Sequence, residues 1–168
     1  MGSILALPVL ILALGLQMAV VSRLTLLHGT ADLILVILVA WTFQENVRAA
    51  WFWALVAGSL VSFVSAMPLF TPLLGYLIIA GFARLLQSRI WRAPILAMFI
   101  TIFAGTIFQH LLSILALLVA DGIPISWMDS LNLITLPSVL LNLFLSLPVY
   151  VLIGDLAKLV YPAEDEYE

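Results

Sequence analysis

Histidines and carboxylates are the side chains of this sequence that could bind a metal or transfer a proton, and they are few and scattered. The two histidines, His28 and His110, lie far apart, and no carboxylate stands one helical turn from His110. A metal site needs three or four converging ligands, whereas His28 and Asp32 offer two. We therefore expect no metal site, and we interpret Asp32 as an acid that caps the helix after it.

Motifs of known catalytic sites are missing as well. The sequence has no Gly-x-Ser-x-Gly, Walker A or HExxH pattern. It has no cysteine, which excludes disulfides, thiolate chemistry and iron–sulfur clusters. We expect neither enzyme activity nor a bound cofactor.

Polar side chains inside long apolar stretches form a second set of candidates: Gln109, His110, Ser113 and Asn142. In lipid a polar group costs several kcal/mol unless it is hydrogen-bonded, so this intramembrane polar cluster must face protein or trapped water. It could line a small-ligand cavity between the fifth and sixth helices, or form hydrogen bonds between them, worth about 0.6 kcal/mol each. We favour the hydrogen bonds, because no charged residue stands among these side chains to hold a charged solute.

Small residues recur every four positions in the third apolar segment, at Ala54, Gly58, Ser62 and Ala66. Such a stripe lets two helix backbones approach closely. It could pack inside the bundle, or it could form a shallow groove for the helix of a partner. We take these four residues as the candidate partner-helix groove.

The amino-acid composition indicates that the chain is a membrane protein. Of 168 residues, 65% are hydrophobic and 9% are charged, whereas a soluble domain has about 25% charged residues. One membrane span needs roughly 20 apolar residues, which leaves room for about six. The net charge of −3 gives no reason to expect a nucleic-acid partner.

Breaks in the apolar pattern divide the chain into six segments. We expect helices over residues 4–21, 32–43, 49–66, 69–86, 94–120 and 133–160. The second is short, since residues 33–43 rise about 16 Å against a hydrocarbon core of about 30 Å. The predicted fold is an all-α integral membrane protein: a compact six-helix transmembrane bundle with a short second helix. Residues 1–161 form the single six-span domain, and residues 162–168 form a short acidic cytoplasmic tail.

Basic residues set the orientation. With both termini inside, the outer side has Arg23, and the cytoplasmic side holds five cations: Arg48, Arg84, Arg89, Arg92 and Lys158. This distribution follows the positive-inside rule. We therefore predict that both termini are cytoplasmic.

Three short motifs carry a family resemblance. The first is Ala31-Asp32-Leu33, which begins a short helix rich in Leu, Ile and Val. The second consists of residues 58–62 followed by Ser65-Ala66 and Leu69, and the third is the pair Asn142 and Pro148. With the size and the six spans, these motifs resemble the MreD family of bacterial rod-shape-determining proteins. The chain departs from the family at Ala31, where the family has proline, and at Ser62, where an acid is often found, so no role of that acid is carried over.

The resemblance implies a non-enzymatic scaffold subunit of the cell-elongation complex that makes peptidoglycan, in the bacterial cytoplasmic (inner) membrane. Its expected partners are the transmembrane helix of a bitopic MreC-like protein, membrane lipid and, indirectly, the RodA polymerase, a penicillin-binding transpeptidase and MreB filaments.

The family is also similar in fold to the substrate-binding subunits of energy-coupling-factor transporters, which gives an alternative: a membrane subunit that binds a vitamin-like small molecule. Such a subunit should have a polar or aromatic pocket open to the outside. The predicted outer loops offer few residues for one: His28, Asp32, Asp121, Trp127 and Asp129. The scaffold needs only small residues that form a groove, and we favour it.

The predicted topology can be tested with single-cysteine variants, because the chain has no cysteine of its own. A membrane-impermeant maleimide applied to intact cells should label Gly122→Cys. It should label Ser88→Cys only after the membrane has been permeabilised. Labelling of Ser88→Cys from the outside would contradict the predicted orientation.

Overall fold

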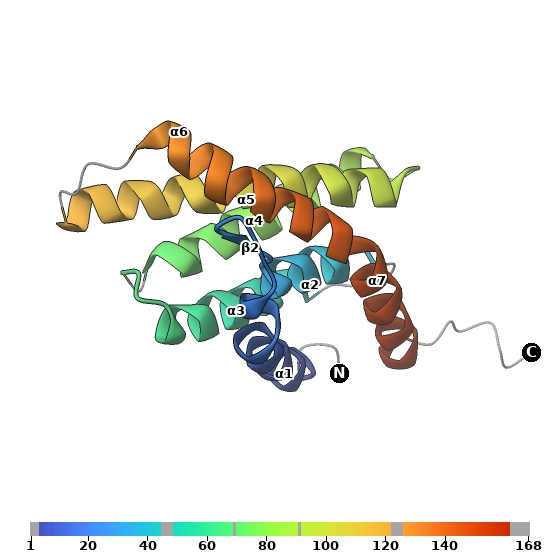
Figure 1. Ribbon diagram of the computed structural model, residues 1–168. Coiled ribbons are helices and arrows are strands. Elements are labelled where there is room, and N and C mark those ends of the chain that lie inside the picture. Colours follow the sequence, from blue (N-terminus) through green and yellow to red (C-terminus); the bar gives the residue numbers. More distant parts are fainter. Residues whose placement is uncertain (1–3, 45–48, 69, 91, 122–125, 162–168) are drawn as a thin grey trace, which may run out of the picture.

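The computed structural model describes residues 4–44, 49–68, 70–90, 92–121 and 126–161, which form helices and one small β-hairpin (Figure 1). In chain order the elements are α1 (Ala6–Ala19), the 3₁₀ turn η1 (Val21–Arg23), β1 (Thr25–Leu26), β2 (Gly29–Thr30), α2 (Leu33–Thr42), α3 (Ala50–Val64), α4 (Phe70–Arg89), α5 (Pro94–Asp121), α6 (Trp127–Asp129), the π-helical turn η2 (Ser130–Thr135) and α7 (Leu136–Val160). Arg48 and the acidic tail of the sequence prediction lie outside the described residues.

Four of the six expected helices have the length and hydropathy that a membrane crossing requires: residues 6–23, Phe70–Arg89, Pro94–Ala120 and Trp127–Val160. The other two are apolar but shorter. For α2, with 10 residues, this agrees with the expected short second helix. Helix α3 was expected to run to residue 66 but has 15 residues and ends at Val64, because Ser65 is already extended, with ψ of 144°.

The last helix begins earlier than the sequence predicted. It starts at Trp127 rather than at residue 133 and runs without a break through α6, η2 and α7. Pro137 lies in its first half and has no N–H, so the carbonyl of Leu133 four residues before it lacks an α-helical donor. The backbone N–H of His28, in the β-hairpin, donates to that carbonyl at 3.0 Å. Farther along, Pro148 lies inside α7, which bends (Figure 1).

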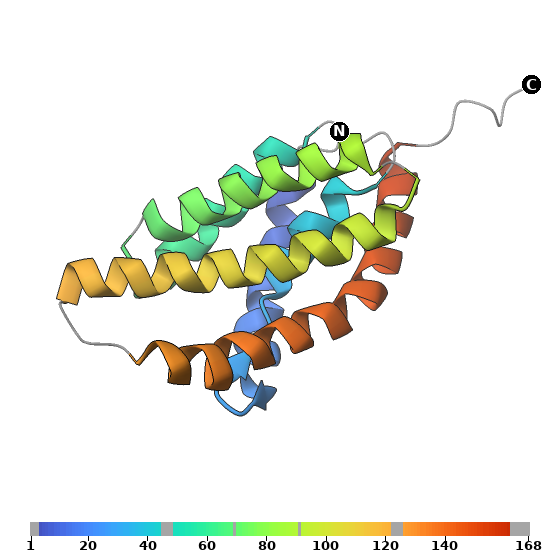
Figure 2. The same cartoon turned by 90° about the horizontal axis from the view of Figure 1, so that it is seen from above.

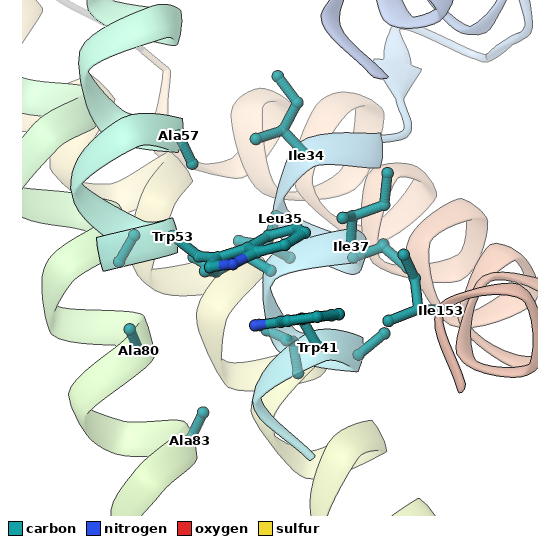
Figure 3. Packing of buried hydrophobic residues seen from close by; sticks show 14 of the residues in the cluster. Ile34, Leu35, Ile37, Trp41, Trp53, Ala57, Ala80, Ala83 and Ile153 are labelled. Atoms are coloured by element: carbon teal, nitrogen blue, oxygen red, sulfur yellow. The ribbon is translucent and has the colours of Figure 1, made fainter. Parts of the chain in front are cut away.

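The short helix α2 lies at the centre of the molecule, and all ten of its residues are buried. A helix that is apolar all round is stable when other helices cover it. Trp41 of α2 stacks on Trp53 of α3, with ring centroids 4.1 Å apart. Figure 3 shows this stack between Ala80 and Ala83 of α4 and Ile153 of α7. Because neighbouring helices surround α2, its length need not match the bilayer.

Two of the cations that the sequence predicts on the cytoplasmic side lie at one end of the bundle. Arg89 lies in the last turn of α4 and Lys158 in the last turn of α7. Figure 2 shows these two helix ends at the same end of the bundle, where α5 also begins. The last turn of α3, the first turn of α4 and the last turn of α5 lie at the opposite end.

The small-residue stripe of α3 meets α4 at Gly58. Ala54, Gly58 and Ser62 are buried, whereas Ala66 lies beyond the end of α3 and is exposed. A Cβ atom at Gly58 would come within 2.7 Å of the Cα of Leu73 in α4. The groove predicted beside this stripe is therefore filled at Gly58 by the chain's own helix, and a partner could enter there only by displacing α4.

We predict that Gly58→Leu destabilises the fold, because the new side chain meets backbone atoms that cannot move without separating α3 from α4. The cost should be on the order of 1–3 kcal/mol, as for overpacked cores, and the monodisperse yield in detergent should fall. Gly15→Leu is the matched control, since nothing lies within 4 Å of a Cβ at Gly15. Equal yields of the two variants would show that α3 and α4 do not pack this closely.

Candidate functional site

The start of α2 is buried in the molecule, and it needs partners for its backbone. The first four N–H groups of a helix have no acceptor within that helix, and inside a membrane protein no bulk water replaces one. Asp32, the N-cap residue, provides one acceptor: its Oδ1 accepts from the backbone N–H of Leu35 at 2.9 Å. This confirms the capping role expected from the sequence.

Two other helices complete the cap. Gln17 of α1 donates from Nε2 to the carbonyl of Ala31 at 2.7 Å and accepts from the N–H of Leu33 on Oε1 at 2.8 Å. Asn142 of α7 accepts from the N–H of Asp32 on Oδ1 at 2.7 Å. Three backbone N–H groups at the start of α2 are therefore bound by side chains from three parts of the chain.

The hydrogen bonds continue from this cap into α4 and α5. Tyr76 of α4, whose side chain is buried, donates its hydroxyl to Asp32 Oδ2 at 2.7 Å. Asn142 donates from Nδ2 to Thr106 Oγ1 of α5 at 2.9 Å. We call Gln17, Asp32, Tyr76, Thr106 and Asn142 the polar junction. It joins α1, α2, α4, α5 and α7.

The β-hairpin positions Asp32 over α7. The hairpin pairs Thr25 with Thr30 and Leu26 with Gly29. A Cβ at Gly29 would come within 2.6 Å of the Ile134 carbonyl oxygen and 2.7 Å of the Ser138 nitrogen, so only glycine allows the hairpin to lie this close to the helix backbone. The N–H of Thr30 donates to Ser138 Oγ at 3.1 Å.

Three residues of the predicted polar cluster, Gln109, His110 and Ser113, line one cavity, whereas Asn142 does not line it. Asn142 belongs to the polar junction. His110 Nδ1 lies 3.1 Å from Thr135 Oγ1, a contact between α5 and η2. Ser113 donates to the backbone carbonyl of Gln109 in its own helix at 2.9 Å. Gln109 packs on Gly75 of α4, and its Oε1 is buried without a hydrogen-bond partner among the described residues.

Four members of the junction were not in the predicted cluster: Gln17, Asp32, Tyr76 and Thr106. Gln17 is a single polar residue inside the first apolar segment, and Asp32 is a cap at the start of the second, so neither position alone indicates a shared buried site. Tyr76 lies in an apolar helix and gives no signal of its own. Their proximity depends on the packing of α1 and α4 around α2, which no local pattern contains.

A cavity of about 340 Å³ adjoins the polar junction. Its lining includes apolar side chains of α1 and α3 and the following polar residues: Gln17, Thr30, Asp32, Ser65, Tyr76, Gln109, His110 and Ser113. His110 and Ser113 also line a second cavity of about 340 Å³, against Ser130 and Thr135 of the last helix. His110 therefore stands between two cavities.

The described part of the chain contains no group of three His, Asp or Glu side chains that could hold a metal ion. His28 is exposed on the hairpin, whereas Asp32 turns into the polar junction, so these two residues do not form a site together. The chain matches no model of a known protein family, no curated protein and no solved structure.

We predict that Asn142→Leu destabilises the protein by about 1–3 kcal/mol, because a side chain of similar size leaves the buried N–H of Asp32 without an acceptor. Unfolding by SDS in mixed micelles would measure the change. Asn132→Leu, at an exposed position of η2, is the matched control and should leave stability unchanged. If both variants were equally stable, the cap would not depend on Asn142.

Proposed function

We propose that this chain is a non-enzymatic scaffold subunit of the bacterial cytoplasmic membrane that binds the transmembrane helix of an MreC-like bitopic protein. In this role it belongs to the cell-elongation complex, and its indirect partners are the RodA polymerase, a penicillin-binding transpeptidase and MreB. The basis is the resemblance of its short motifs to the MreD family.

One observation carries this proposal: two of the motifs that are distant in sequence meet in space. Asp32 of the Ala31-Asp32-Leu33 motif donates its backbone N–H to Asn142, the residue that precedes Pro148 in the late motif. A hydrogen bond of 2.7 Å between them gives both motifs one structural purpose, which is to hold a short central helix in place. This is the role expected of a rigid scaffold.

An apolar groove between α5 and α7 offers a place for the partner helix. It has a volume of about 480 Å³ and is lined by Phe99, Ile100, Phe103 and Leu143. Ile100 and Phe103 are exposed on the outside of the bundle, where lipid or another helix must cover them. The groove presents no polar side chain, so an apolar helix can fill it without leaving a hydrogen bond unmade.

The alternative function, a small-molecule-binding subunit of an energy-coupling-factor type transporter, is favoured by the cavity at the polar junction. That cavity has the polar lining which such a subunit needs. The scaffold remains our choice, because Asp32 and Asn142, which meet in space, both belong to motifs of the resemblance to the MreD family.

We predict that Leu143→Trp fills the groove and abolishes co-purification of the MreC-like partner in mild detergent, while the monodisperse yield stays normal. Leu152→Trp is the control: it lies two and a half helical turns later, is 68% exposed, and should retain the partner. His110→Leu should also retain it, since His110 does not line the groove.

Partner retention by Leu143→Trp at normal yield would contradict the proposed groove. If His110→Leu lost the partner and also lost a water-soluble ligand, the transporter-subunit function would replace the scaffold.

A further inference from the structure

We infer that the cavity at the polar junction binds a ligand with an ammonium group that carries N–H donors. The inference concerns a site other than the α5–α7 groove, and it does not depend on the scaffold function. Its basis is the balance of donors and acceptors around the cavity.

The first part of that balance is the carboxylate of Asp32. Its oxygens accept from two uncharged donors, the Leu35 N–H and the Tyr76 hydroxyl. Among the described residues no Lys or Arg forms an ion pair with Asp32, and the cavity has no Lys or Arg in its lining. A carboxylate accepts about four hydrogen bonds, so Asp32 retains capacity for a cationic donor.

The second part is His110. The hydroxyl hydrogen of Thr135 is used toward the carbonyl of Ser130, to which Thr135 Oγ1 donates at 3.1 Å. We therefore assign Thr135 Oγ1 as the acceptor and place the hydrogen of His110 on Nδ1, which lies 3.1 Å away. In a neutral imidazole the other nitrogen is then an acceptor, so His110 adds a second acceptor to the lining.

Two of the hydroxyl groups around the cavity, those of Tyr76 and Ser113, do not offset these acceptors. Tyr76 donates its hydrogen to Asp32, and Ser113 donates its hydrogen to the Gln109 carbonyl. A cavity with a carboxylate and a neutral imidazole, in which the Tyr76 and Ser113 hydrogens are already used, favours a cation that brings its own N–H groups. Its volume of about 340 Å³ is at the lower end of small-ligand pockets, which suits a primary ammonium group.

Such a group could belong to a lipid headgroup or to a soluble amine, and both sources can be tested. The purified full chain is reconstituted in nanodiscs, and native mass spectrometry counts retained phosphatidylethanolamine against retained phosphatidylcholine. Both lipids are zwitterionic, but the choline headgroup has no N–H. In a second arm, ethanolamine is titrated against the protein, with tetramethylammonium as the donor-free control.

We expect selective binding in one of the arms: phosphatidylethanolamine over phosphatidylcholine identifies a lipid, and ethanolamine over tetramethylammonium identifies a soluble amine. Asp32→Asn should weaken that binding by about tenfold or more, because a charge-assisted hydrogen bond is lost. Asp129→Asn removes an exposed carboxylate and should leave it unchanged.

A further variant tests the inference even if Asp32→Asn fails to fold. Tyr76→Phe removes a competing donor from Asp32 Oδ2 but keeps the carboxylate, so it should bind the selected ligand at least as tightly as the native chain. Weaker binding by folded Tyr76→Phe would overturn the inference. So would the absence of selectivity in both arms, or native-like binding by folded Asp32→Asn.

Discussion

The structure depends on one constraint: a helix that begins inside an apolar bundle must find acceptors for its first amide groups. Water cannot provide them there, and each unpaired group costs free energy comparable to a lost hydrogen bond. In this chain the acceptors come from Asp32, Gln17 and Asn142. Because these side chains belong to separate elements, satisfying the backbone of α2 also fixes where α1 and α7 lie around it.

The same constraint explains features that look unrelated. Pro137 leaves a carbonyl without a donor in the last helix, and the β-hairpin supplies one from His28. Gly29 allows that approach, and the hairpin then leads directly to Asp32. The hairpin, the start of α2 and the first half of the last helix therefore form one hydrogen-bonded unit. The apolar packing of α2, including the stack of Trp41 on Trp53, is built on that unit.

Local patterns in the sequence contain much of the fold but little of the site. Composition predicts an apolar helical protein, and Asp32 before an apolar run predicts a capped short helix, which the structure confirms. The early start of the last helix at Trp127 was missed, because Asp129 and Ser130 read as a loop when they belong to a capped helical start and a π turn. The polar junction could not be predicted, because Gln17 and Asn142 are 125 residues apart and meet only through the backbone of α2. Sequence spacing did identify the small residues of α3, but only packing shows that Gly58 faces α4.

Hydrogen exchange of the backbone N–H groups at the start of α2 tests the central claim most directly. Mass spectrometry of a peptide that spans residues 31–36, from protein in nanodiscs, would measure it. The account predicts that these groups exchange as slowly as those in the middle of α5, and that Asn142→Leu accelerates exchange in this peptide before it affects α5. Rapid exchange in the native protein, at the rate of the exposed hairpin turn, would contradict the account.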